Sequence, residues 1–301
     1  MSKKRIIISA LRRSGSTIFW RCFRQASKAL CFDEPFNPTL IQLPQSHEKD
    51  VYGEYIDVLE TDSKAFWDSY APIYSLDELS NDFRRGQAAW LQWLLRRHNE
   101  VVIDTTRCWN KVGRLAKVVD GNAYVIHLHR SPAGFAASHL LPSELTSSLA
   151  GRWQLFKRRR RFFEMTSGFN YWNMEEITGR GPQSAYGVKI LGDAELAERF
   201  YSWAAHTRLM YFWKDAYERV EQAGKSAFGD RYVSVSYERF SREPETVLTE
   251  VQQRTGLSLD LERLPDVKPS KPVFQEGNSR WYEAAEKAGL EANRQVLFRP
   301  Q

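Results

Sequence analysis

Two arginines and three hydroxyl side chains are crowded into one short polar turn near the start of the chain. The turn spans residues 11–17 and has the sequence LRRSGST. Its members after the leucine are Arg12, Arg13, Ser14, Gly15, Ser16 and Thr17. Arginine donors, hydroxyl donors and backbone N–H groups are common ligands of a phosphate or another small oxyanion. The composition of this turn therefore predicts an anion-binding site.

The segments on either side of the turn predict the secondary structure that positions it. Residues 6–8 are three consecutive isoleucines, typical of a strand buried on both faces of a parallel sheet. From residue 18 to residue 30, apolar side chains recur at helical spacing. A strand, a tight turn and a helix in this order place the first N–H groups of the helix at the carboxyl edge of the sheet, where the helix dipole favours negative charge. We therefore expect a phosphate-binding loop between a first strand and a first helix.

The turn differs from two familiar nucleotide-binding loops. A Walker A loop requires the pattern GxxxxGK[ST], whose lysine contacts the terminal phosphates. Residues 11–17 contain one glycine and no lysine, which disfavours a metal-dependent kinase or ATPase of that class. The turn also lacks the pattern GxGxxG, which weakens a dinucleotide-binding interpretation. What remains is a loop that binds phosphate through arginine, hydroxyl and backbone groups.

A second predicted strand-to-helix junction carries an arginine and a serine that suit the same type of ligand. Residues 124–128 (YVIHL) have an apolar strand pattern, and Arg130 lies just beyond its end. Pro132 suits the first turn of a helix, which places Ser138 about two turns along that helix. We expect Arg130 and Ser138 to face the same ligand.

The remaining patterns predict an α/β protein with a central parallel sheet flanked by helices. Further strands are expected at residues 101–104 and 231–237, and helices at residues 81–98, 110–119, 193–220, 244–256 and 281–292. Residues 31–60 are rich in proline and are expected to be irregular. Residues 141–188 have no clear periodicity. We expect them to form a helical or irregular insertion, facing the substrate or acting as a lid, within a single domain of residues 1–301.

Composition limits the class of protein. The chain has 301 residues, of which 42% are hydrophobic, enough for a sizeable core. Its 43 basic and 37 acidic residues give a net charge of +6, which favours an anionic ligand without requiring nucleic acid. Cys22, Cys31 and Cys108 have no CxxC spacing, so neither a zinc site nor a disulfide framework is predicted. No apolar run is long enough for a membrane span or a signal peptide, and a cytoplasmic location is expected.

Three segments resemble those of the sulfotransferase family. Residues 13–17 (RSGST) are similar to its 5′-phosphosulfate loop, the stretch from Arg130 to Ser138 is similar to its 3′-phosphate motif RxPxxxxxS, and residues 237–244 (YERFSREP) resemble its YExLxxxP segment. The segments at 31–37 and 104–107 are more similar to carbohydrate sulfotransferases than to the phenol and steroid enzymes. The resemblance covers roughly residues 5–138 and 200–260 and leaves the insertion and the tail outside it.

The resemblance implies a P-loop-like three-layer fold and a specific reaction. A sulfuryl group would pass from 3′-phosphoadenosine 5′-phosphosulfate (PAPS), as co-substrate, to a hydroxyl or amine, and we expect the acceptor on a carbohydrate or glycoconjugate. A transferring sulfuryl group carries less negative charge than a phosphoryl group, so the magnesium clamp of kinases becomes dispensable and no metal is expected.

The resemblance also assigns roles to individual residues. Those expected to bind the co-substrate are Arg12, Arg13, Ser14, Gly15, Ser16, Thr17, Arg130, Ser138, Tyr237 and Arg280. Arg13 would contact the bridging oxygen of the phosphosulfate, Arg130 and Ser138 the 3′-phosphate, and Tyr237 the adenine. Arg280 either serves the 3′-phosphate or simply begins the last helix. The family more often has lysine at the Arg13 position; because arginine does not readily donate a proton, we expect charge stabilisation there rather than acid catalysis.

The acceptor needs a general base, and Glu34 is the leading candidate. Carbohydrate-active members of the family place a glutamate followed by proline behind the first helix, as at Glu34. Asp33 and Asp104 are reserve candidates. The histidines that flank the second motif are His127, His129 and His139. Apolar neighbours favour the interpretation of these histidines as packed, hydrogen-bonded side chains.

Two interpretations stay open beside this one. The basic cluster at residues 157–161 (KRRRR) suits an anionic glycan, a membrane surface or nucleic acid, but a solvated helix face or a mobile loop is the favoured interpretation. The second function class is a non-catalytic protein that keeps the nucleotide loop and holds an anionic partner through this cluster. No nucleic-acid partner is expected.

Overall fold

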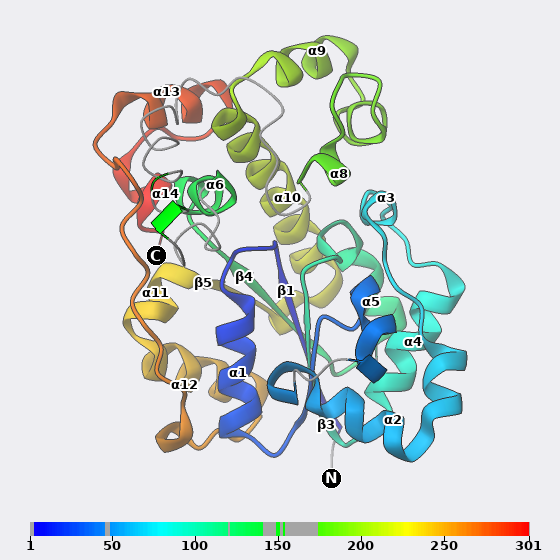
Figure 1. Cartoon of the computed structure of the whole chain (residues 1–301). Helices are drawn as coiled ribbons and strands as arrows, with labels where there is room; N and C mark the ends of the chain where they lie inside the picture. Colours follow the sequence, from blue (N-terminus) through cyan, green and yellow to red (C-terminus); the bar gives the residue numbers. More distant parts are fainter. Residues whose placement is uncertain are drawn as a thin grey trace. The chain divides into compact units, whose positions relative to one another are not determined.

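The computed structural model describes residues 3–45, 49–119, 121–140, 149–150, 153 and 174–300 (Figure 1). The contacts within the chain divide it into two compact units. Unit 1 comprises Met1–His129 and Arg219–Pro269, and unit 2 comprises Arg130–Glu218 and Ser270–Gln301. All the strands of the described residues belong to unit 1, whereas the described elements of unit 2 are helical.

Unit 1 is built on a sheet of five parallel strands in the order β2-β3-β1-β4-β5. The strands are β1 (Lys4–Ala10), β2 (Leu30–Asp33), β3 (Glu100–Thr105), β4 (Tyr124–His129) and β5 (Tyr232–Ser236). Residues 6–8 of the central strand β1 are at most 1% exposed, as expected of a strand covered on both faces. Because the chain continues to β2 and β3 on one side of β1 and to β4 and β5 on the other, the carboxyl end of β1 lies at the switch point where such sheets bind ligands.

One layer of helices fixes the first helix against the sheet. This layer contains α1 (Ser16–Ala26), α11 (Tyr237–Arg242) and α12 (Pro244–Thr255). The rings of Phe19 in α1 and Phe240 in α11 meet edge to face with centroids 4.9 Å apart, and both side chains are fully buried. Burial of apolar area, worth about 25 cal/mol per Å², therefore holds α1 and the turn at its N-terminus in place.

The other helices of unit 1 lie before β3, after β3, before β5 and, for the last of them, after α12 in the chain. They are α2 (Lys49–Ser69), α3 (Ser75–Glu78), α4 (Arg85–Leu95), α5 (Val112–Val118), the last part of α10 (Ala205–Phe228) and the 3₁₀ helices η1 (Pro38–Gln45), η2 (Trp109–Lys111), η6 (Gly229–Arg231) and η7 (Leu261–Arg263). Aromatic rings join α2 to α4, with the centroids of Phe66 and Trp90 5.1 Å apart.

Unit 2 is described from its helices. They are α6 (Pro132–Leu140), α8 (Met174–Thr178), the π-helical turn η5 (Gly187–Leu191), α9 (Ala194–Ser202), the first part of α10, α13 (Ser279–Lys287) and α14 (Arg294–Phe298). Trp281 of α13 is fully buried and meets the ring of Phe298 in α14 at a centroid distance of 6.5 Å. Among the described residues, no helix is both long enough and apolar enough to cross a membrane.

The sequence predictions for the sheet and its main helices are confirmed. The four predicted strands correspond to β1, β3, β4 and β5, and the helix expected at 244–256 is α12, which Pro244 opens and Gly256 ends. The segment at 31–60 differs from the prediction that it is irregular. It contains most of β2, and its last part belongs to α2. Of its three prolines, Pro35 lies in the connection between β2 and η1, whereas Pro38 and Pro44 lie within η1.

Two expected helices are each divided in the structure. The helix expected at 193–220 consists of α9 and α10, separated by residues 203–204. The ring of Tyr186 packs against Phe200 of α9 and Phe212 of α10, so the apolar periodicity continues across the break. The helix expected at 281–292 ends at Lys287 in α13, and Gly289, with φ of 68°, precedes the separate helix α14.

Candidate active site

The N-terminal turn (residues 11–17) connects β1 to α1 through two left-handed residues. Arg13 has φ of 68° and Gly15 has φ of 86°. A non-glycine residue in this region costs about 1–3 kcal/mol, a strain that is concentrated at functional sites in proteins. No side chain caps α1 at Gly15, and the first turn of the helix contains no acidic residue. The helix N-terminus therefore offers backbone N–H groups and a positive dipole end, as the sequence predicts.

Ser14 is a second feature of the turn that suits an oxyanion. Its side chain is 1% exposed, and its Oγ has no hydrogen-bond partner in the described part of the chain. A buried hydroxyl without a partner costs about 1–3 kcal/mol. A phosphate oxygen at the N-terminus of α1 would accept this hydrogen bond, so the residues present fit a bound phosphate group.

Gly15 and Tyr237 are in direct contact. Tyr237 begins α11 immediately after β5, and a Cβ placed on Gly15 would lie 2.2 Å from its Cε2 atom. Only glycine fits at this position, because any side chain would overlap the aromatic ring. The structure thus brings together the first and third segments on which the family resemblance rests.

Arg12 is engaged by a carboxylate that sequence reasoning missed. Glu78, at the end of α3, is fully buried and accepts hydrogen bonds from both terminal nitrogens of Arg12, with Nη1 at 2.9 Å from Oε2. Nη1 of Arg107 donates to Oε1 of the same carboxylate at 2.9 Å. Burial raises the pKa of Glu78, and the two arginines oppose that rise. Glu78 therefore links the N-terminal turn to the loop after β3.

Lys111 fixes the segment that carries Glu78. Its ammonium group donates to three backbone carbonyl oxygens, those of Asp77 at 2.6 Å, Ser80 at 2.6 Å and Asp82 at 3.0 Å. The side chain is buried, so these bonds replace its hydration. A four-residue helix such as α3 has too little periodicity to be recognised, which is why Glu78 was not predicted.

Glu34 lies at the carboxyl end of β2 in a strained backbone position. Its φ is 42°, and its backbone N–H donates to the carbonyl oxygen of Asp104 at 2.9 Å. Thr106 Oγ1 donates to Oε1 of Glu34 at 2.9 Å, and Arg107 Nε lies 4.0 Å from Oε2. The side chain is 23% exposed, so solvent or a ligand can reach it. Glu34 lies near Arg107, Arg107 contacts Glu78, and Glu78 contacts Arg12. These charged contacts connect Glu34 to the N-terminal turn.

The reserve candidates Asp33 and Asp104 form a buried acidic pair beside Glu34. They are register partners on β2 and β3 and are 7% and 0% exposed. Burial, assisted by the charge of Glu34, raises the pKa of Asp33 to about 7. Burial and the Asp33 charge raise the pKa of Asp104, and the hydroxyl of Ser16 opposes that rise. The pair therefore retains a proton near neutral pH, which favours Glu34 over either aspartate as the base.

The three histidines are all packed. His127 is fully enclosed, and its Nδ1 lies 2.8 Å from the hydroxyl oxygen of Tyr232. Burial lowers the pKa of His127 well below its usual value and that of His129 to about 4. His139 Nδ1 lies 3.0 Å from the carbonyl oxygen of Phe135 in its own helix. The contacts of His127 and His139 give these two histidines a structural explanation.

In unit 2, the second motif forms the start of a helix. Pro132 is the first residue of α6, and the Ser131 hydroxyl accepts a hydrogen bond from the N–H of Gly134 at 3.2 Å. Ser138 Oγ donates to the carbonyl oxygen of Phe135 at 2.8 Å, and Arg130 precedes the helix. The sequence placement of these residues at a helix start is confirmed, while their binding role stays a prediction.

Arg280 also lies in unit 2, in the first turn of α13. It lines a cavity of about 400 Å³ together with His206 and Lys287, and burial followed by the charges of Arg280 and Lys287 lowers the pKa of His206 to about 4. The basic cluster at 157–161 lies outside the described residues, as does most of the expected insertion.

Within the described ranges, no group of three or more His, Cys, Asp or Glu side chains is arranged to hold a metal ion. Cys22, Cys31 and Cys108 are buried and form no disulfide, and burial raises the pKa of all three thiols.

Comparisons with known proteins give structural neighbours of one kind. No protein-family model and no curated protein sequence matches the chain. The sulfotransferase domain of the Synechococcus PCC 7002 olefin synthase is 14% identical, with coverage of 99% of this chain and 87% of that chain and a TM-score of 0.44. Sulfotransferase STF1 from Mycobacterium tuberculosis H37Rv is 12% identical (96% and 78% covered, TM-score 0.44). The sulfotransferase domain from the curacin biosynthetic pathway is 14% identical (97% and 99% covered, TM-score 0.41). Values this low do not transfer a family or an activity, so function is argued from the residues.

Proposed function

We propose that the chain is a PAPS-dependent sulfotransferase whose phosphosulfate site is the N-terminal turn. The observation that carries the proposal is the buried Ser14 hydroxyl without a partner, held beside the uncapped N-terminus of α1 and the left-handed Arg13. These groups together supply hydrogen-bond donors and positive charge at the switch point of a parallel sheet. The missing Walker lysine argues against ATP hydrolysis at the same turn.

The residues of the turn would act on the leaving phosphate. As the S–O bond to the 5′-phosphate breaks, the phosphate takes the bonding electron pair, and Arg13 stabilises the charge that develops on it. Ser14, Ser16, Thr17 and the backbone N–H groups of the helix start hold the phosphate oxygens. The charge of Arg12 adds to the positive field of the turn, with its guanidinium oriented by Glu78.

Glu34 would act on the acceptor. As the new S–O or S–N bond forms, the Glu34 carboxylate takes the proton of the acceptor hydroxyl or amine. Thr106 orients one carboxylate oxygen, and Nε of Arg107 lies 4.0 Å from the other. We assign Arg130, Ser138 and Arg280 to the 3′-phosphate and Tyr237 to the adenine from the family resemblance. On the same basis we propose a hydroxyl on a carbohydrate or glycoconjugate as the acceptor.

Transfer of labelled sulfate from PAPS to a panel of saccharide, phenol and amine acceptors tests the proposal. We expect a labelled saccharide product, and we expect Arg13→Gln to lower turnover by about 100-fold or more, as the loss of one transition-state donor does elsewhere. Arg263→Gln removes the same charge from an exposed position of unit 1 and serves as the control. A protein that binds the nucleotide but labels no acceptor would support the non-catalytic function class instead.

A further inference from the structure

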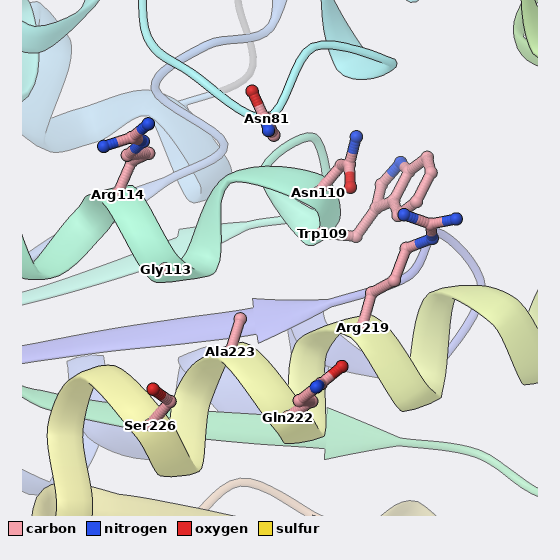
Figure 2. Close-up of a pocket in the computed structure, with 9 residues that line it drawn as sticks. All are labelled: Asn81, Trp109, Asn110, Gly113, Arg114, Arg219, Gln222, Ala223 and Ser226. Atoms are coloured by element: carbon pink, nitrogen blue, oxygen red, sulfur yellow. The ribbon is translucent and has the colours of Figure 1, made fainter. Parts of the chain in front are cut away.

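Unit 1 contains a polar cavity of about 450 Å³. The residues that line it take no part in the proposed reaction. It lies between α5 and the last part of α10 (Figure 2). The nine lining residues are Asn81, Trp109, Asn110, Gly113, Arg114, Arg219, Gln222, Ala223 and Ser226. Its volume falls within the usual range of small-molecule sites, roughly 300–1,000 Å³.

The two walls of the cavity are formed by single helical faces. Residues 219, 222, 223 and 226 follow the spacing of one face of α10, and residues 110, 113 and 114 follow that of the facing segment of η2 and α5. Gly113 and Ala223 meet where the helices cross, with a Cβ on Gly113 only 3.5 Å from that of Ala223. Because these two residues are small, open space remains beside them, and the polar side chains labelled in Figure 2 line it.

The lining is positively charged. Arg114 comes from α5 and Arg219 from α10, and no acidic residue is among the nine lining residues. Asp82, outside the cavity, has its Oδ2 atom 3.9 Å from Nε of Arg114, but both side chains are substantially exposed, Arg114 at 42% and Asp82 at 62%. An exposed pair of this kind is worth at most about 1 kcal/mol, so it competes weakly with a ligand anion.

The other polar groups that line the cavity can form hydrogen bonds with the hydroxyl groups of a ligand. Asn81, Gln222 and Ser226 are exposed and can both donate and accept hydrogen bonds. Asn110 donates its Nδ2 to the carbonyl oxygen of Leu79 at 2.8 Å, which fixes the amide and leaves Oδ1 as an acceptor. A purely apolar ligand would form no hydrogen bonds with these amide and hydroxyl groups. Inorganic sulfate would bind the two arginines but has no hydroxyl groups for the amides and the serine.

We propose that this cavity binds a small polyhydroxylated organic anion, such as an acidic or sulfated sugar unit. The two guanidinium groups recognise its carboxylate or sulfate, and the amides and the serine recognise its hydroxyls. The same chemistry is found in a free sugar acid and in an acidic unit within a glycan. Neither PAPS nor sulfuryl transfer is required for this binding.

Binding is measured by titrating the full-length chain, without nucleotide, with four probes: glucose 6-sulfate, glucuronate, glucose and inorganic sulfate. The indole N–H signal of Trp109, assigned in ¹⁵N NMR with Trp109→Phe, reports on occupancy. We expect the two sugar anions to shift this signal saturably at millimolar concentration or below, and to bind at least about tenfold more tightly than glucose or sulfate. Equal affinities for glucose and glucuronate, or for sulfate and glucose 6-sulfate, would overturn the proposal, as would no shift at about 20 mM probe.

Variants locate the site. Arg114→Gln combined with Arg219→Gln is expected to weaken glucose 6-sulfate binding by about tenfold or more, whereas Arg263→Gln, on the exposed surface of unit 1, leaves it unchanged. If the double variant does not fold, Ser226→Leu replaces it: this exposed helix position tolerates leucine, whose side chain would occupy part of the cavity and remove a hydroxyl from its lining. Unchanged binding in the folded double variant or in Ser226→Leu would contradict the assignment.

A glycoside separates the two sources of the anion. Methyl glucuronide has a blocked anomeric hydroxyl, as a unit within a glycan does. Binding equal to that of glucuronate identifies a glycan unit, and weaker binding identifies a free sugar acid. Because no nucleotide is present, failure of this proposal leaves the sulfotransferase proposal untouched.

Discussion

Arg12 in the N-terminal turn and Glu78 in α3 form a two-pronged ion pair in which the carboxylate is fully buried. Glu78 also accepts a hydrogen bond from Arg107, so one carboxylate holds two guanidinium groups together. Glu78→Gln keeps the shape of the side chain but removes the buried negative charge that both arginines contact. We expect a loss of about 3–5 kcal/mol in the free energy of unfolding, measured by urea titration.

Asp77→Asn is the matched control for Glu78→Gln. Asp77 is the preceding residue and pairs with Arg84, whose side chain is 72% exposed. An exposed ion pair contributes about 1 kcal/mol or less. Similar losses in the two variants would show that the buried pair does not have the structural role assigned to it.

Gly15→Ala tests the contact between the N-terminal turn and Tyr237. Alanine at this position combines an unfavourable φ with an overlap between its Cβ and the aromatic ring. Gly256→Ala is the control, because Gly256 has φ of 67° and open space around its Cβ position. We expect Gly256→Ala to cost about 1 kcal/mol and Gly15→Ala clearly more, with the excess removed when Tyr237→Ala is added. Equal losses in the two alanine variants would argue against the contact.

The acidic pair predicts how stability depends on pH. The pKa of Asp33 is raised in the folded chain to about 7, from an ordinary value of 3.8, so the folded state binds more protons than the unfolded state between these values. Stability should therefore fall as the pH rises from about 4 to about 7, by about 1.4 kcal/mol for each pKa unit. Asp33→Asn should remove this part of the dependence. The difference in unfolding free energy between the two proteins is the measurement, and a difference independent of pH would be inconsistent with a raised pKa.

Glu34→Gln separates binding from catalysis. Glutamine keeps the acceptor oxygen that Thr106 contacts but cannot take a proton at neutral pH. We expect nucleotide affinity within about twofold of the parent chain and turnover reduced by about 100-fold or more. Glu250→Gln, at an exposed ion pair, should change neither. An active Glu34→Gln protein would remove Glu34 as the base.

The sequence predicts the parts of this molecule that depend on local pattern. Residues 6–8 are continuously apolar, residues 124–128 are apolar apart from His127, and the turn after the first strand lacks acidic residues, so β1, β4 and an uncapped helix start follow directly. Tyr237 and Gly15 were assigned to one site from separate segments, and the structure places them in contact.

The missed parts depend on long-range contacts. β2 has only four residues, and its partner β3 lies far along the chain, so its pairing has no local signal. Glu78 acquires its role only because Lys111 and two arginines converge on a short helix. The cavity beside Trp109 likewise needs two helices from separate parts of the sequence, α5 and α10.

The central claim is that the N-terminal turn binds the phosphosulfate end of PAPS. Isothermal titration of the full-length chain with 3′-phosphoadenosine 5′-phosphate, the desulfated product, tests it most directly. We expect one saturable site with a dissociation constant in the micromolar range, weakened by about tenfold or more in Arg13→Gln and unchanged in Arg263→Gln. Absence of binding at high micromolar nucleotide in a folded sample would contradict the account.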